Sequence, residues 1–293
     1  MKKDSANHPI SPLRLLTIAA NTITEVSRQK FFYILFVFAI VVLCCSLFFS
    51  EFSSTEQMKF TKDFGLAAMM FFGALIAIVG TAELLPLELE NRTIYPILAK
   101  PVYRAEFLFG KYVGMISLLF ITLFLMSLIF FGILLHTEHK LIADSLVSGT
   151  HQGSTAEETI RQLKAQVRDP ALVKAIGLIF FKLVIVSALG LLIGTFATSV
   201  IFNVICNSLL YICGHLTGIA RQEWMSSADL PLRGLLGIIV FFVPDLDVFN
   251  VADAVVTGQG VPMALVLQTI RYGLTYTMVV LLLAYFFFQN KEI

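Results

Sequence analysis

Two long runs without a charged residue, 64–82 and 112–135, restrict the fold of this chain more than any other feature. About 20 apolar residues are enough for a helix to cross a bilayer core roughly 30 Å thick. Inside lipid every main-chain N–H and C=O group must be paired, so only helices and closed barrels can cross. Because these runs are longer than barrel strands, they predict an all-α membrane protein.

The composition of the chain agrees with this class. Hydrophobic residues make up 57% of the 293 residues and charged residues only 14%. A soluble domain is typically about a quarter charged. The chain is therefore expected to pass through the membrane several times.

The same reasoning along the whole chain predicts six transmembrane helices. The expected spans are 31–50, 64–86, 108–135, 173–198, 201–220 and 262–288. The first run follows a 30-residue polar start and precedes no small-residue cleavage site, so it is expected to remain as a helix. The run 234–243 is too short to cross and stops at Pro244. It is expected to be re-entrant or interfacial and to precede the last span.

Residues 1–30 are expected to form a separate cytoplasmic start, followed by the transmembrane domain 31–293. Within this start, apolar residues recur at helical spacing from Leu15 to Val26, at Leu15, Leu16, Ala19, Ile23 and Val26. Arg14, Glu25 and Arg28 fall elsewhere on the helical wheel. Such a helix is typical of one lying in the membrane interface. An ordinary basic lead-in to the first span is the alternative.

The orientation of the chain should follow the asymmetry of Lys and Arg between the two sides. The totals barely discriminate, because the spans predict ten such residues on one side and nine on the other. Five basic residues precede the first span, whereas the loop after it has only Lys59 and Lys62. Both termini and the segment 88–107 are then expected to be cytoplasmic, and the loop 136–172 to be external.

The segment between the two charge-free runs is polar and broken by prolines. Its sequence from Glu88 to Lys111 is ELENRTIYPILAKPVYRAEFLFGK. Such a segment cannot lie in lipid. It is the place where this membrane protein is expected to meet a soluble partner, although a plain wet loop between helices is the alternative.

Motifs for catalysis or nucleotide binding are missing from the sequence. Gly110-Lys111 is followed by Tyr112, and Ala105 stands where a phosphate-binding loop needs its first glycine. No HExxH or GxSxG motif occurs, and Cys44, Cys45, Cys206 and Cys213 all fall within apolar runs. The chain is therefore expected not to be an enzyme, and to bind no cofactor, metal or nucleic acid by itself.

Four polar residues inside the expected spans are candidates for lining a transport path: Lys182, Asn203, Asn207 and Arg271. A charge inside a span is costly unless it pairs, reaches the interface or faces water. Structural pairing of Lys182 and Arg271 is therefore the alternative reading. For the two asparagines, hydrogen bonding between helices is the alternative.

The polar segment resembles a motif of the ABC-2 type ABC transporter permeases. Glu90-x-x-Thr93, Pro101-x-x-Arg104 and Gly110-Lys111 resemble that family's pattern E-x-x-x-T-x-x-x-L-L-x-x-P-x-x-R-x-x-x-x-x-G-K, although Glu90 stands one residue closer to Thr93. The stretch 244–250, PDLDVFN, is similar to the P-N-L-x-x-F-N stretch of the branch called "multi-copper enzyme maturation permease". No Met, His and Cys cluster with ligand spacing supports the metal link in that name.

The resemblance implies a function and a set of partners. In such permeases the segment between spans 2 and 3, here 88–107, is a cytoplasmic coupling helix that docks on a separate ATPase subunit. The residues that would serve this coupling are Glu88, Glu90, Arg92, Thr93, Pro96, Lys100, Pro101, Arg104, Gly110 and Lys111. Two ATPase copies carrying ATP and Mg²⁺, and a second copy of this chain or a paralogous permease, would complete the transporter.

The resemblance also implies export across a bacterial cytoplasmic membrane, with an accessory periplasmic protein as a further partner. Two other functions stay open. One is a secondary transporter driven by an ion gradient, and the other is a membrane scaffold that recruits a soluble protein through 88–111.

Overall fold

The computed structural model describes residues 12–48, 54–86, 103–147, 161, 167–226, 237 and 243–290. All regular secondary structure in these ranges is helical. The elements are α1 (Pro12–Ser27), α2 (Lys30–Cys45), the 3-10 turn η1 (Ser46–Phe48), α3 (Ser54–Glu83), α6 (Arg104–Val147), α8 (Pro170–Phe196), α9 (Val200–Ser226), the 3-10 turn η2 (Asp247–Phe249), α11 (Ala252–Val256) and α12 (Met263–Asn290).

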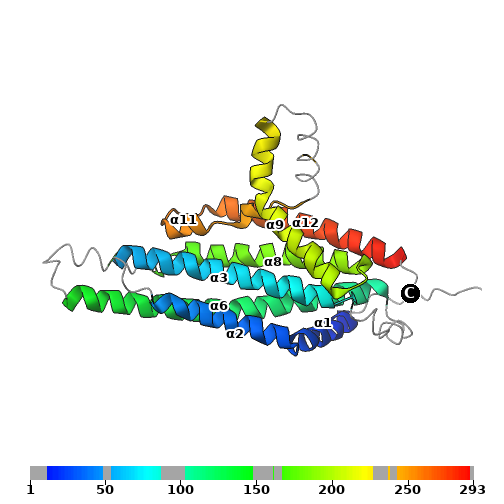
Figure 1. Cartoon of the computed structure of the whole chain (residues 1–293), viewed down its shortest axis with the longest axis horizontal. Coiled ribbons are helices and arrows are strands. Elements are labelled where there is room, and N and C mark those ends of the chain that lie inside the picture. Colours follow the sequence, from blue (N-terminus) through cyan, green and yellow to red (C-terminus); the bar gives the residue numbers. More distant parts are fainter. Residues whose placement is uncertain are drawn as a thin grey trace, which may run out of the picture.

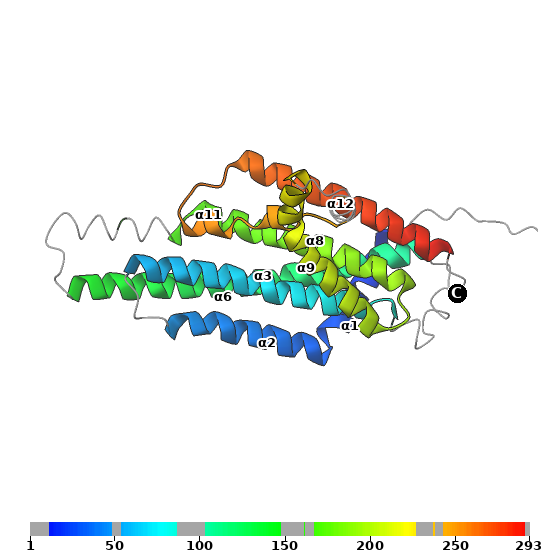
Figure 2. The same cartoon turned by 45° about the horizontal axis from the view of Figure 1, so that its top comes forward.

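The long helices run side by side, with α3 and α8 at the centre (Figure 1). Helix α8 packs between α12 and α3, and α3 packs in turn against α6 and α2. The turned view shows α2 and α12 on opposite sides of this layer (Figure 2). Most of the buried apolar side chains of the core come from α3, α6 and α8.

One end of the helices gathers segments from across the chain (Figure 1). Helix α1, the last turn of α3, the first turn of α6 and the last turn of α12 lie there, and we call it the α1 end. The start of α8, α11 and the start of α12 lie toward the opposite end. Part of α9 follows the other helices, whereas its C-terminal part stands away from them.

Five helices are each long and apolar enough to cross a membrane: α3, α6, α8, α9 and α12. Helix α2 has only 16 residues, and together with α1 it makes a sixth candidate span that is bent by 69°. The all-α membrane class predicted from the sequence is confirmed. The described helices support five spans directly and a sixth only through this bent pair.

Two helices are longer than the sequence predicts. Helix α3 begins at Ser54 rather than at 64, and α6 continues to Val147, well into the expected external loop 136–172. The charges at 59, 62 and 63 end an apolar run, but they do not end a helix. Lys62 is in fact 1% exposed, so packing against neighbours continues beyond the apolar stretch.

The predicted helix at the start of the chain is present as α1, and its buried face agrees in part with the expected one. Ala19 and Val26 are buried as expected, whereas Thr22 is buried as well and Leu16 is 60% exposed. The reason is that α1 packs against α6, so the residues of α1 that are buried are those that face α6. Most of the predicted re-entrant element 234–243 lies outside the described residues.

Candidate functional site

Of the ten residues expected to couple the chain to an ATPase, three are described: Arg104, Gly110 and Lys111. The other seven lie outside the described residues: Glu88, Glu90, Arg92, Thr93, Pro96, Lys100 and Pro101. The visible part of the site is therefore the first two turns of α6, directly after the polar segment.

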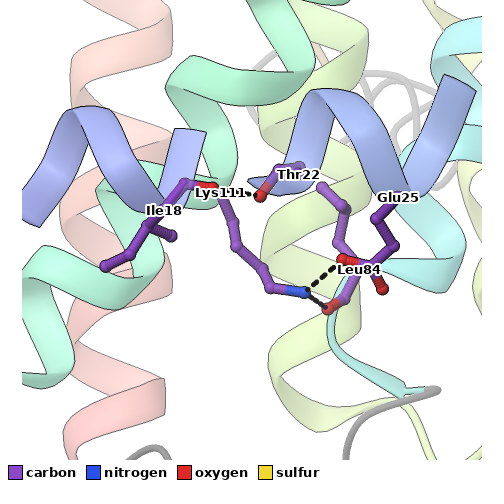
Figure 3. Close-up of polar contacts among 5 residues, drawn as sticks. All are labelled: Ile18, Thr22, Glu25, Leu84 and Lys111. Carbon is purple, nitrogen blue, oxygen red and sulfur yellow. Dashed lines mark hydrogen bonds and ion pairs between the residues drawn. The ribbon is translucent and has the colours of Figure 1, made fainter. Parts of the chain in front are cut away.

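Lys111 joins three helices at the α1 end (Figure 3). Its ammonium group donates a hydrogen bond of 2.8 Å to the main-chain carbonyl of Leu84, just after the end of α3. The same group lies 3.6 Å from the carboxylate of Glu25 in α1. Its side chain is only 2% exposed. A buried charge is tolerated when it is paired, and the free carbonyls at a helix C-terminus favour a cation.

The cation also lies 5.5 Å from the centre of the Phe107 ring, one turn earlier in α6. This distance is within the range of a cation–π interaction. Lys111 therefore has three kinds of partner, each from a different place in the chain: a carboxylate of α1, a carbonyl after α3, and a ring of α6.

Arg104 and Glu106 fix the first turn of α6. A guanidinium nitrogen of Arg104 donates to the carbonyl of Gln289 at 2.8 Å and approaches that of Phe288 at 3.4 Å, both in the last turn of α12. The Glu106 carboxylate accepts a hydrogen bond of 3.2 Å from the Tyr103 N–H, at the start of the helix, where N–H groups have no acceptor within the helix. It also lies 3.9 Å from Arg14 of α1.

Two glycines let α1 approach α6 closely. Gly110 and Gly114 are one turn apart on the same face of α6, and both contact α1. A Cβ atom at Gly114 would lie 2.7 Å from the carbonyl oxygen of Ala19, and one at Gly110 would lie 2.8 Å from the Ile18 side chain. Small residues at this spacing are typical of closely packed membrane helices.

Together these contacts tie the start of α6 to α1, to the end of α3 and to the end of α12. No reacting group is involved, and the arrangement has no catalytic chemistry to perform. It is suited to transmitting a displacement, because a push on the first turn of α6 is passed to three other helices at once.

Lys182 lies in the interior of the bundle and is fully buried. Its ammonium group contacts the sulfur atom of Met70 on α3 at 3.2 Å. A thioether is a weak acceptor. The carboxylate of Asp247, at the start of η2, also acts on this cation through its charge.

Asn203 and Asn207 of α9 face α8 and are fully buried. The Asn203 amide donates to the carbonyl of Gly190 at 3.1 Å and approaches that of Ala82 at 3.4 Å, and the Asn207 amide approaches that of Val186 at 3.4 Å. A Cβ atom at Gly190 would collide with Thr81 and Asn207. The two asparagines thus link α9 to α8 and α3, as expected for hydrogen bonding between membrane helices.

Arg271 lies apart from the other three path candidates. It is exposed on α12 and lines a shallow depression of about 640 Å³ together with Gln268 and Thr275. The structure therefore places the four candidates in three different environments, and it does not join them into one path.

Within the described residues, no three His, Cys, Asp or Glu side chains lie close enough together to hold a metal ion. Cys44 and Cys45 are exposed on α2, and Cys206 and Cys213 are half-buried on α9 as free thiols. We assign no cofactor to this part of the chain.

Three charged residues of the site were not singled out from the sequence: Arg14, Glu25 and Glu106. For Arg14 and Glu25 the signal is their spacing. Together with Ile18 and Thr22 they fall on one side of a helix, the side that packs on Gly110 and Gly114 of α6. The signal for Glu106 is its place three residues after the start of a helix, where a carboxylate can cap a free N–H.

Comparison with known protein families finds a match for part of the chain. Residues 24–156 match the model of a family described as "ABC-2 family transporter protein". The matched part begins near the end of α1 and contains α2, α3 and the whole of α6. No curated protein matches the chain.

Proposed function

We propose that this chain, whose residues 24–156 match the model of an ABC-2 family transporter protein, is the membrane subunit of an exporter driven by a separate ATPase subunit. ATP and Mg²⁺ are then bound by the partner, and the segment 88–107 is the surface on which the partner docks. The permease itself contributes the mechanical part of the cycle.

The observation that carries this proposal is the anchoring of the first two turns of α6, where that segment ends. Arg104, Glu106 and Lys111 connect the first two turns of α6 to α12, α1 and the end of α3. If α6 were held loosely, a movement of the docking segment would not displace the other helices. Here the first two turns of α6 are held by ionic or hydrogen-bond contacts to three other helices.

A second copy of the chain is proposed to complete the pathway, as closed pairs are the commonest assemblies of identical subunits. Helix α9 supports this part of the proposal. One stripe of α9 is apolar and more than half exposed: Ile201, Ile205, Leu209, Ile212, Leu216 and Ile219. Only 22% of the most apolar part of α9 is buried, against 72% for α8, so α9 has a free face for a partner helix.

We place the protein in a bacterial cytoplasmic membrane with both termini on the cytoplasmic side. Two observations support this orientation. Five basic residues precede the first span, whereas the loop after it has only Lys59 and Lys62. Moreover, α1 and the last turn of α12 both contact the start of α6, so the two terminal helices end on the same side as the docking segment.

Site-specific crosslinking tests the proposal. The four cysteines are first replaced by serine, and Thr93→Cys carries a photoreactive crosslinker while the chain is purified from its native membrane. We expect a crosslink to a soluble protein with a nucleotide-binding motif, identified by mass spectrometry. The same crosslinker at His139→Cys, an exposed position at the opposite end of α6, serves as the control and should give none.

A crosslink to the ATPase from position 139 but not from 93 would reverse the assignment. ATP hydrolysis by the purified chain alone would overturn it altogether. In vesicles containing the complex, flux that requires an ion gradient but not ATP would favour a secondary transporter. An intact complex without any flux would favour a scaffold.

A further inference from the structure

A pocket of about 320 Å³ opens where the end of α9, the segment 243–250 and the first part of α12 meet. Its polar lining comes from Arg221 of α9, Asp245 of the segment, and Gln268, Thr269 and Tyr272 of α12. Val248 and Leu265 add apolar walls. The volume lies at the lower end of the range for small-molecule sites, roughly 300–1,000 Å³.

The walls of this pocket are firmly held. Leu246 is fully buried, and its N–H donates a hydrogen bond of 3.0 Å to the carbonyl of Gly214 in α9. Phe249 is 1% exposed, and its ring lies 6.2 Å from the ring of Tyr272. The segment that carries Asp245 is therefore fixed to α9 on one side and to α12 on the other.

Asp245 gives the pocket an acceptor without a partner. The residue is 5% exposed, and its N–H donates to the hydroxyl of Tyr272 at 2.9 Å. Its Oδ2 atom lies 3.5 Å from Arg221, but Oδ1 has no hydrogen-bond partner among the described residues. Burying an acceptor without a donor is costly. Oδ1 itself is closed off from the pocket, so a ligand with an N–H or O–H group would donate to Oδ2, the carboxylate oxygen beside Arg221.

The charges around the pocket indicate the charge of that ligand. Arg221 and Asp245 form a pair with no net charge, so a cation would meet the guanidinium and an anion would meet the carboxylate. A neutral group that both donates and accepts can donate to the carboxylate and accept from the guanidinium. Gln268 offers a donor and an acceptor. The Tyr272 hydroxyl accepts a hydrogen bond from the Asp245 N–H, so its own hydrogen remains available to donate to a ligand.

A hydroxyl group donates one hydrogen bond and accepts two, so adjacent hydroxyls match a neighbouring carboxylate and guanidinium. We propose that this pocket binds an uncharged, hydroxyl-rich ligand the size of one sugar ring. One hydroxyl donates to Asp245 Oδ2, and its neighbour accepts from Arg221. The apolar edge of the ring rests on Val248 and Leu265.

The pocket is distinct from the coupling site at the α1 end. Gln268 to Tyr272 follow the start of α12 by five to nine residues, or roughly 8–14 Å at 1.5 Å per residue, in the half of the helix away from α1. The proposal goes beyond transport driven by an ATPase. It concerns binding by this chain alone, so it can succeed or fail independently of the proposed function.

Fluorescence titration of the purified full chain tests the site. The only tryptophan of the sequence, Trp224, stands three residues after Arg221 in α9 and serves as a reporter. The chain is kept in lauryldimethylamine oxide, a detergent without hydroxyl groups, and methyl glucoside is the probe. We expect a saturable change in fluorescence together with a higher melting temperature. Ethylamine and inorganic phosphate, as cationic and anionic probes, should give neither.

Two variants and a matched control separate binding from a general effect of sugar. Asp245→Asn and Gln268→Leu should each weaken binding about tenfold, the effect of losing one strong hydrogen bond. Gln268 is exposed, so its variant reports on the site even if Asp245→Asn does not fold. Asp253→Asn on α11, which lies outside the pocket, should bind like the parent. Equal responses from all four proteins, or saturable binding of ethylamine or phosphate instead, would overturn the proposal.

Discussion

Lys111 of α6 donates a hydrogen bond of 2.8 Å to the main-chain carbonyl of Leu84, which follows the last residue of α3. Leu84 precedes the proposed docking segment 88–107 by four residues and Lys111 follows it by four, so the bond joins the chain on both sides of that segment. Glu25 of α1 joins the same cation. These contacts of Lys111 therefore hold together the parts of the chain that flank the proposed docking segment.

Lys111→Met should lower the free energy of unfolding by about 3 kcal/mol, because removing one partner of a buried ion pair leaves the other groups unsatisfied. An unfolding titration in detergent measures the change. Lys140→Met, an exposed lysine on the same helix, should change stability by less than about 0.5 kcal/mol. Equal effects of the two substitutions would show that the Leu84 and Glu25 contacts contribute nothing.

Gly114→Ala should separate α1 from α6. The new methyl group would lie 2.7 Å from the Ala19 carbonyl oxygen, and main chain cannot move aside as a flexible side chain can. Overpacking of this kind costs about 1–3 kcal/mol. Hydrogen exchange of the α1 amides should become faster.

Gly132→Ala is the matched control for this prediction. Gly132 lies on the same helix, and nothing lies within 4 Å of a Cβ atom built there. Its exchange should stay as in the parent chain. Unchanged exchange in both variants would mean that α1 does not depend on the glycine face.

Lys182→Met should leave stability unchanged or raise it slightly, because the ammonium group is fully buried and its hydrogen bond goes to a thioether, a weak acceptor that compensates poorly for lost water. Lys174→Met should act in the opposite direction. Lys174 donates a hydrogen bond of 2.9 Å to the carbonyl of Val261, and losing it should cost about 1 kcal/mol. A loss above about 3 kcal/mol for Lys182→Met would show that the cation is a structural support.

Gly190→Ala should push α9 away from α8, because its methyl group would collide with Thr81 and Asn207. The melting temperature should fall, and Thr81→Ala in the same chain should restore part of the loss by removing the nearest atom. Gly177→Ala, on the same helix with open space around it, is the control. Failure of the double substitution to recover any stability would place the strain elsewhere.

Asp169→Ala should weaken the start of α8. The Asp169 side chain accepts a hydrogen bond of 2.8 Å from the N–H of Ala171, as an N-cap residue does. The expected cost is about 1 kcal/mol in the unfolding titration, and Asp169→Asn should keep most of the stability because asparagine caps equally well. Equal losses for both variants would mean that the charge of Asp169, rather than its capping bond, supports the helix.

The sequence predicted the helical membrane class well, because hydrophobic length has a direct physical limit in the bilayer. The bounds of α8 and α12 lie within three residues of the predicted spans. The start of α3 and the end of α6 were missed, because a helix continues past its last apolar residue wherever its neighbours still pack on it. Lys62, a charge that appeared to mark a loop, is buried within α3.

The motif around Gly110-Lys111 could also be found from the sequence, but its partners could not. The pairs Arg14 with Glu106 and Arg104 with Gln289 connect residues that are far apart in the chain. No local pattern states which helices are neighbours. The spacing of Arg14, Ile18, Thr22 and Glu25 on one side of α1 becomes informative only once α6 is known to lie against it.

Helix α6 has one further consequence. Its 44 residues extend about 66 Å at 1.5 Å per residue, more than twice the thickness of a bilayer core, without an interruption. If the first turn near Arg104 rotates, the same continuous helix would therefore carry the movement across the whole bilayer, because it has no break at which the two halves could move separately.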